Sequence, residues 1–275
     1  MPWRIDTPEP LEEAAQAAVA ARIERFDRDW SRFRDDSLVA RISRQPGRYR
    51  LPDDAGPLLE LYRELYGVTG GRVSPLVGRA LESLGYDGSY TLRAASVREG
   101  VPAWDDAIAW DGEYLETVTP VLLDVGAVGK GYLIDLVSGV LAERGFAEHV
   151  IDASGDLLAR GEVRMRVALE HPRDPKKAIG VVELHDGALA ASASNRRAWG
   201  DGLHHVLDAV TGEPTGSVLA TWAMAGSAML ADGAATALFF EPSPDWVQRG
   251  EIHYVRMFAS GAAELSLSFP GELFS

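Results

Sequence analysis

The sequence contains no cysteine. Disulfides, thiolate metal sites and a thiol nucleophile are therefore excluded, and any bound metal must use oxygen or imidazole ligands. Long apolar runs are missing too. Because a membrane-spanning helix needs about 18 or more consecutive apolar residues, we expect no transmembrane segment.

Positive charge is scarce. Lysine and arginine number 27 against 41 aspartates and glutamates, which gives a formal net charge of -14, and no run of five basic residues occurs. Nucleic-acid binding requires a concentration of positive charge, so a nucleic-acid partner is not expected. The first residues contain no charged and apolar leader pattern and no lipidation cysteine. We expect a cytoplasmic protein as given, or an exported one if the chain has been trimmed.

The overall composition is that of a folded soluble protein. Hydrophobic residues make up 46% and charged residues 25% of the 275 positions. This length can bury a large core, and no linker-like stretch divides the chain. We therefore predict one domain covering residues 1–275.

Helical patterns dominate the first third of the chain. Apolar residues recur at intervals of three and four in residues 9–30 and 57–67, and shorter helices are predicted at 37–42 and from 74 to 84. In the last of these, Ser74 is the expected N-cap and Pro75 opens the first turn. A later helix is predicted at 130–144, where five apolar residues form one stripe.

Strand patterns dominate the rest. Strands are predicted at 108–110, 114–118, 121–125, 148–153, 156–160, 163–169, 179–184, 188–192, 218–225, 252–258 and 264–269. Residues 185–187 (HDG) predict a hairpin turn, and Ser154-Gly155 predicts another. Helices followed by hairpins favour an α+β fold with mainly antiparallel sheets.

The stretch DGLHHVLDAVTGEPTG at residues 201–216 places an imidazole near a carboxylate. His205 lies three residues before Asp208, at the start of a Thr-Gly-Glu-Pro-Thr-Gly turn. The two side chains could be a satisfied core pair or a catalytic pair. By strand alternation, His204 points to the opposite face and is expected to be solvated.

Residues 122–131 (LLDVGAVGKG) lead from a predicted strand through a glycine-rich turn to a helix. The spacing excludes a Walker A loop, which needs four residues between its first glycine and Gly-Lys, and Ser or Thr after the lysine. Free N–H groups at a helix start still attract phosphate. Lys130 could therefore bind a phosphate group, or it could be a solvated lysine after a tight turn.

Asp232 and Thr236 lie four residues apart in the sequence ADGAATA. On a helix this spacing brings both oxygens to one face, an arrangement that suits Mg²⁺. The alternative is an aspartate near a helix start and a packed threonine. The preceding residues 218–230 are nearly free of charge. A carboxylate in such surroundings needs a cation or hydrogen bonds, which favours metal binding.

Six segments together resemble the family of FAD:protein FMN transferases, the ApbE-type flavin transferases, from about residue 30 to residue 261. In the family's order they are WSRFRDDS at 30–37, TGG at 69–71 with LGY at 84–86, DVGAVGKG at 124–131, DASGD at 152–156, HVLDAVTGEP at 205–214 and ADGAATA at 231–237.

The resemblance implies an ApbE-type α+β fold, with a helical N-terminal third packed on mainly antiparallel sheets, FAD as substrate and a Mg²⁺ ion. It implies metal ligation by Asp232, Thr236 and the carbonyl of Ala127. The implied FAD site is lined by Phe33, Leu84, Gly85, Tyr86, Asp124, Lys130 and His205.

The implied reaction moves the FMN half of FAD onto a threonine or serine hydroxyl of an acceptor flavoprotein and releases AMP. The nearest alternative is a Mg²⁺-dependent FAD pyrophosphatase, in which water attacks instead. A flavin-binding protein without catalysis is the alternative from another class. If the protein is a transferase or a pyrophosphatase, we expect His205 to take the proton from the attacking group. Its pKa is expected to be near neutral, and its neighbours are expected to orient it. Asp208 is its predicted catalytic partner.

Overall fold

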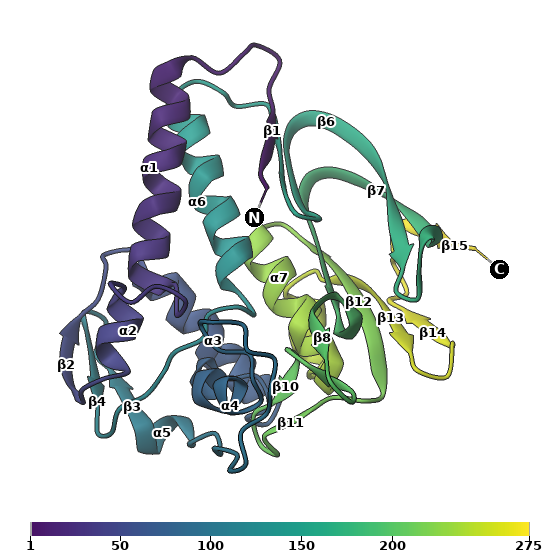
Figure 1. The fold of residues 1–275 in the computed structure, drawn as a ribbon. Helices are drawn as coiled ribbons and strands as arrows, with labels where there is room; N and C mark the ends of the chain where they lie inside the picture. Colours follow the sequence, from purple (N-terminus) through teal and green to yellow (C-terminus); the bar gives the residue numbers. More distant parts are fainter. Residues whose placement is uncertain (1, 275) are drawn as a thin grey trace. The chain divides into compact units, whose positions relative to one another are not determined.

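A large antiparallel sheet is the main feature of the computed structural model, which describes residues 2–274. Its strands run in the order β1-β5-β6-β7-β12-β13-β14, and β15 pairs with β7. Figure 1 shows β6 and β7 as long curved strands. The bounds are β1 (Arg4–Asp6), β5 (His149–Ala153), β6 (Asp156–His171), β7 (Asp174–Ala193), β12 (Val218–Ala225), β13 (His253–Phe258), β14 (Ala263–Leu265) and β15 (Gly271–Leu273).

Backbone contacts group the chain into two compact units. The first, hereafter the sheet unit, comprises residues 1–23, 130–196 and 216–275. The second, the helical unit, comprises residues 24–129 and 197–215. The single domain of residues 1–275 stays a prediction.

The sheet unit buries its apolar strand faces together with helix α7 (Ala228–Ala237), which packs against β7 and β12. Alternate residues of β12, including Trp222 and Met224, enter one apolar core with Leu157, Leu184 and Val255. The other helices are α6 (Gly129–Glu143), whose first residue belongs to the helical unit, and α8 (Pro244–Arg249), with the 3₁₀ turn η3 (Leu238–Phe240) after α7.

The helical unit contains short helices and small sheets. Helix α1 (Glu13–Trp30) belongs to this unit from Glu24 onward. The remaining elements are α2 (Leu38–Ile42), β2 (Gly47–Arg50), α3 (Ala55–Val68), η1 (Pro75–Val77), α4 (Gly78–Ser83), α5 (Trp104–Ala107), β3 (Ile108–Trp110), β4 (Tyr114–Thr117), β8 (Ala198–Trp199), β9 (Leu203–His204), β10 (Leu207–Asp208) and β11 (Glu213–Pro214). The 3₁₀ turn η2 (Ser194–Arg197) crosses the boundary between the units.

Most predicted elements are confirmed, and the α+β class with antiparallel sheets is correct. Ser74 caps the turn that follows it, because its hydroxyl accepts from the N–H of Leu76 at 3.2 Å and Pro75 comes next. The Ser154-Gly155 turn joins β5 to β6 with both residues at positive φ, as a two-residue hairpin requires. Among residues 2–274, no helix is long and apolar enough to span a bilayer.

Some strand predictions are wrong. The predicted strands 156–160 and 163–169 form the single strand β6. Residues 185–187 do not form a hairpin turn, because β7 continues through them and pairs with β6 on both sides. The positive φ of Asp186 belongs to a bend in this pairing, where the register shifts. Residues 121–125 form no strand. Their apolar side chains are buried in an irregular segment, and the N–H of Asp124 donates to the Pro75 carbonyl at 2.7 Å.

Helices α6 and α7 approach closely at Gly131. A Cβ built on Gly131 would lie 2.1 Å from the Ala228 carbonyl oxygen, which no side chain can tolerate. The Gly131 N–H donates to Oδ2 of Asp232 on α7 at 2.8 Å. In return, Asp135 of α6 accepts from the N–H groups of Ala228 and Met229, at 2.9 and 2.8 Å. Each helix start is thus satisfied by a carboxylate of the other helix.

We expect Gly131→Ala to lower the free energy of unfolding by roughly 2–4 kcal/mol, because the added methyl group must push α6 away from α7. Urea denaturation measures the change. Gly139→Ala is the matched control on the same helix, since a Cβ there has no neighbour within 4 Å. It should be neutral or stabilising by up to about 1 kcal/mol. Equal effects of the two substitutions would contradict this account of the helix crossing.

Candidate functional site

In the sheet unit, three charged groups gather at the start of α6. The Lys130 ammonium forms an ion pair with Asp156 at the start of β6, and it lies 3.9 Å from Oδ1 of Asp232. The two carboxylates are buried, with 3% and 7% of their side chains exposed. Lys130 is thus no solvated lysine, and buried acids of this kind need the cation beside them.

Of the predicted metal ligands, Asp232 and Thr236 are one turn apart on α7, and the side chain of Thr236 is half-buried. Carboxylate and hydroxyl oxygens are the donors that Mg²⁺ prefers, so these residues fit the ion chemically. Within residues 2–274, no group of three or more His, Asp or Glu side chains is gathered so that it could hold a metal ion. The third predicted ligand, the Ala127 carbonyl, belongs to the helical unit.

In the helical unit, Asp124 anchors the glycine-rich turn. One carboxylate oxygen accepts from the Gly126 N–H at 2.7 Å, and the other accepts from Nε of Arg32 at 2.5 Å. The Tyr62 hydroxyl donates to the Asp124 carbonyl and accepts from the Ala127 N–H, both at 3.2 Å. The predicted site residues Asp124 and Ala127 are therefore held by one tyrosine.

Phe33 and Tyr86, two of the predicted flavin contacts, belong to a group of aromatic rings. Tyr86 has its ring centroid 5.6 Å from those of both Phe33 and Trp199, and Phe33 stacks on Tyr90 at 5.4 Å. Phe33 and Tyr90 remain 39% and 55% exposed, which is unusual for large aromatic residues. An exposed group of rings is a suitable surface for a planar ligand.

Leu84 and Gly85 give this aromatic group its backbone support. The Leu84 carbonyl accepts from the Trp199 indole at 2.8 Å. Gly85 has a φ of +98°, and a Cβ there would lie 2.4 Å from the Arg93 backbone nitrogen. Only glycine fits this position, because both the conformation and the space exclude a side chain. The sequence Leu-Gly-Tyr therefore fixes where the Tyr86 ring lies.

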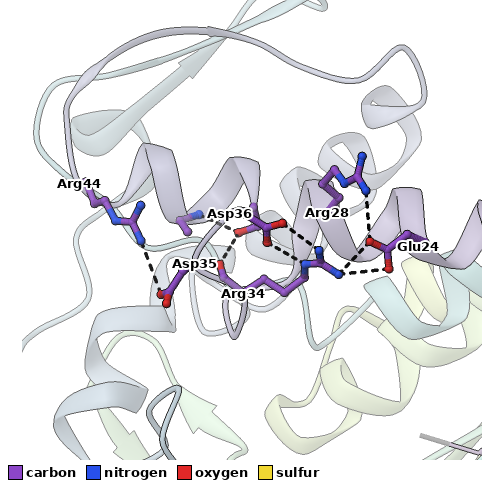
Figure 2. A network of polar contacts seen from close by, with 8 residues as sticks. Glu24, Arg28, Arg34, Asp35, Asp36 and Arg44 are labelled. Carbon is purple, nitrogen blue, oxygen red and sulfur yellow. Dashed lines mark hydrogen bonds and ion pairs between the residues drawn. The ribbon is translucent and has the colours of Figure 1, made fainter.

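An ion-pair network lies next to the loop that carries Arg32 and Phe33, and it orients this loop (Figure 2). Arg34 forms two hydrogen bonds with Asp36, both at 2.9 Å, and reaches Glu24 of α1 at 3.1 Å. Arg28 also pairs with Glu24. The hydrogen bond from Arg34 lowers the pKa of the Asp36 carboxyl. These groups are exposed, so the network orients the loop and contributes little to stability.

His205 lies between β9 and β10 and is largely buried. Burial, followed by the charges of Arg197 and His204, lowers its pKa to about 4. The predicted near-neutral pKa is therefore wrong, because the sequence pattern does not reveal this desolvation. Its Nδ1 is buried and accepts no hydrogen bond from any residue in the range 2–274. At pH 7 the ring is neutral and can take up a proton.

Asp208 has other partners than His205. Its carboxylate accepts from Arg72 and from the Val210 N–H, each at 2.9 Å, and so holds the turn that follows. The catalytic role of Asp208 stays a prediction. The expected solvation of His204 is wrong, since this ring is buried and pairs with the Thr215 carbonyl at 2.7 Å. It departs from simple alternation because β9 ends at His204 and the chain turns there.

Comparisons with known proteins show the family and the fold. The sequence model of the ApbE family matches residues 1–255. The chain belongs to the ApbE family. Its fold is similar to that of the ApbE protein from Thermotoga maritima, with a TM-score of 0.83, 24% identity and coverage of 98% of this chain and 94% of the other. The apo flavinyl transferase ApbE of Pseudomonas stutzeri gives a TM-score of 0.78 at 21% identity, covering 96% and 91%.

Two relatives of this ApbE-family chain are named FAD:protein FMN transferase. The Rhodobacter capsulatus protein is 28% identical over 255 residues, which is 87% of this chain. The Klebsiella pneumoniae protein is 25% identical over 86% of this chain. The chain spans about half the length of the first relative, 49%, and 74% of the second.

Several residues that contact the candidate site residues were not predicted from the sequence. Arg32 and Tyr62 hold Asp124, Asp135 caps α7, and Tyr90 extends the aromatic group. Arg32 and Phe33 are neighbours in the WSRFRDDS segment, so that segment could have indicated Arg32. For Tyr62 and Asp135 no local pattern exists, since both lie on ordinary helix faces.

We expect the buried neutral imidazole of His205 to make stability depend on pH. In the unfolded chain the ring takes up a proton near pH 6.5, whereas in the folded chain it does so only near pH 4. The free energy of unfolding is therefore unaffected by this ring above about pH 6.5. It falls by up to about 3 kcal/mol as pH falls from about 6.5 to 4, because the unfolded chain then binds a proton that the folded chain does not. Urea denaturation at pH 7 and pH 4.5 should show a smaller loss for His205→Gln than for the wild type. The exposed His185→Gln is the control and should behave as the wild type.

Proposed function

We propose that this chain is a Mg²⁺-dependent flavin transferase that moves FMN from FAD onto a threonine or serine hydroxyl of an acceptor flavoprotein and releases AMP. The observation that carries the proposal is the meeting of Lys130 and Asp232 at the start of α6, 3.9 Å apart, in a member of the ApbE family. A cation and a carboxylate at a helix start suit a diphosphate with its metal ion. The names of the relatives support FAD as the substrate.

Asp232 and Thr236 of the sheet unit would hold the magnesium ion, and the Ala127 carbonyl stays a predicted third ligand. When bound, the ion supplies a Lewis acid that polarises the diphosphate and stabilises the leaving AMP. Asp232 is prepared for such a role, because its Oδ2 is already oriented by the Gly131 N–H. Lys130 is oriented by Asp156 and would add positive charge to the phosphates.

In the transfer step, the acceptor hydroxyl oxygen would form a bond to the phosphorus of the FMN half. The bond between that phosphorus and the bridging oxygen breaks, and AMP leaves with the bond's electron pair. The hydroxyl proton would go to the imidazole of His205, which is neutral at neutral pH and whose buried Nδ1 has no hydrogen-bond partner within residues 2–274. A diphosphate bound near this ring would raise its pKa from about 4 toward neutrality, and so make it a stronger base.

The direct test is incubation with FAD and Mg²⁺, with and without a flavoprotein acceptor that carries the target threonine. We expect AMP release and covalently yellow acceptor only in the complete mixture, and EDTA should abolish both. AMP formed at the same rate without acceptor would instead show a pyrophosphatase. No AMP in either mixture, with flavin still bound, would contradict any catalytic function.

We expect Asp232→Asn to reduce AMP release by about 100-fold or more, because several kcal/mol of charge stabilisation depend on the carboxylate. The asparagine carbonyl can still accept from the Gly131 N–H, so the fold should be preserved. Steady-state rates at saturating Mg²⁺ measure the effect. Asp245→Asn, at an exposed acid in the first turn of α8, is the matched control and should leave the rate unchanged. Full activity of the Asp232 variant would remove this residue from the metal site.

A further inference from the structure

Arg32 in the helical unit is a buried arginine whose two terminal nitrogens are unused. Its side chain is 2% exposed, and its Nε donates to Asp124 at 2.5 Å. For Nη1 and Nη2, no acceptor exists within residues 2–274. A buried donor without a partner costs stability, and this guanidinium carries two such donors. A bound ligand that accepts from them would remove the cost.

The surroundings of Arg32 define what such a ligand must be. The guanidinium carbon lies 4.2 Å from the ring centroid of Phe33 and 4.8 Å from that of Tyr86, so aromatic rings border it. Asp124 already balances its charge. Because the ion pair is neutral overall, the unused edge suits uncharged acceptors more than a phosphate. A guanidinium edge with two parallel N–H donors matches two adjacent acceptors in one plane.

We propose that Arg32 binds the acceptor edge of the flavin ring, where a carbonyl oxygen lies beside a ring nitrogen, by donating from Nη1 and Nη2. The proposal rests on the proposed function, since it presumes that the ligand is FAD. Adenine fits the same donors less well, because its N7 acceptor lies beside an amino group that is itself a donor. Arg32 is then a specificity residue that selects the flavin half of the dinucleotide.

Binding titrations of Arg32→Lys test the inference, with riboflavin, FMN and AMP as separate probes. Lysine keeps the positive charge beside Asp124 but lacks the planar edge with two parallel N–H donors. We expect riboflavin and FMN to bind at least about 10-fold more weakly, and AMP to bind within about twofold of the wild type. The shift of the flavin absorption bands on binding should also diminish. Arg48→Lys is the matched control, since Arg48 is an exposed arginine of β2 that pairs with Asp111 and Glu116 away from these residues, and it should change none of these values.

Three outcomes would overturn the inference. Unchanged flavin affinity and spectrum in folded Arg32→Lys would show that the guanidinium is only structural. A loss confined to FMN and AMP, with riboflavin unaffected, would assign Arg32 to a phosphate. Equal losses for AMP and riboflavin would remove the selectivity.

A measurement on the wild-type chain applies even if Arg32→Lys does not fold. Two riboflavin analogues, in which sulfur replaces either the C2 or the C4 carbonyl oxygen, carry a weaker acceptor at one edge, and one of the two should bind at least about threefold more weakly than riboflavin. Equal affinity of riboflavin and both analogues would contradict the proposed contact. If the wild type binds neither flavin nor AMP, the proposed function itself fails and this inference fails with it. Flavin binding that is indifferent to Arg32 and to the sulfur analogues leaves the proposed function intact.

Discussion

The close approach of α6 and α7 at Gly131 is the constraint on which the sheet unit's charged cluster depends. Because Gly131 has no side chain, the Ala228 carbonyl can come within a distance that any Cβ would forbid. The same approach brings Asp232 within hydrogen-bond reach of the Gly131 N–H and places Lys130 near that carboxylate. One missing methyl group thus permits packing, helix capping and charge pairing at a single point.

Burial decides the chemistry of the titratable groups in both units. Asp135 is buried where it caps α7, and burial raises the pKa of its carboxyl even though two N–H groups lower it. His205 shows the opposite direction, as expected for a base, because burial there disfavours the protonated ring. The residue types alone do not determine these states. The surrounding packing determines them.

The sequence allowed the parts of the fold with a local cause to be predicted. Ser74 before Pro75 predicted a capped turn, and Ser154-Gly155 predicted a tight hairpin, because backbone geometry alone requires those residues. The predictions for residues 121–125 and 185–187 were wrong because they depended on contacts with distant parts of the chain. Both have a strong local pattern, but the first lacks a pairing partner and the second lies within a strand that is paired on both sides of it. Which strands meet is decided by the whole chain.

For the candidate site, the family resemblance indicated which residues matter, but their states required the structure. Lys130 and Asp232 were predicted, and they lie close together. Asp156, the partner of Lys130, ends the DASGD segment, which is one of the six segments that carry the resemblance. Nothing in the sequence shows that His204 is buried or that His205 has a low pKa, since both depend on the fold of residues 197–215. The site's electrostatics are therefore a tertiary property.

Several buried polar atoms of the helical unit have no hydrogen-bond partner in the part of the chain that the structure describes, and they are candidates for contacts with a ligand. Five buried side-chain atoms of the helical unit have no hydrogen-bond partner within residues 2–274: Nη1 and Nη2 of Arg32, Nδ1 of His205, Nε1 of Trp110 and Oγ1 of Thr215. The charge of Asp124 acts on His205, and its carboxylate holds Arg32, so one aspartate links the two residues. Each unpaired buried atom lowers stability. A ligand that accepts from Arg32 and interacts with His205 would remove this cost at three of the five atoms.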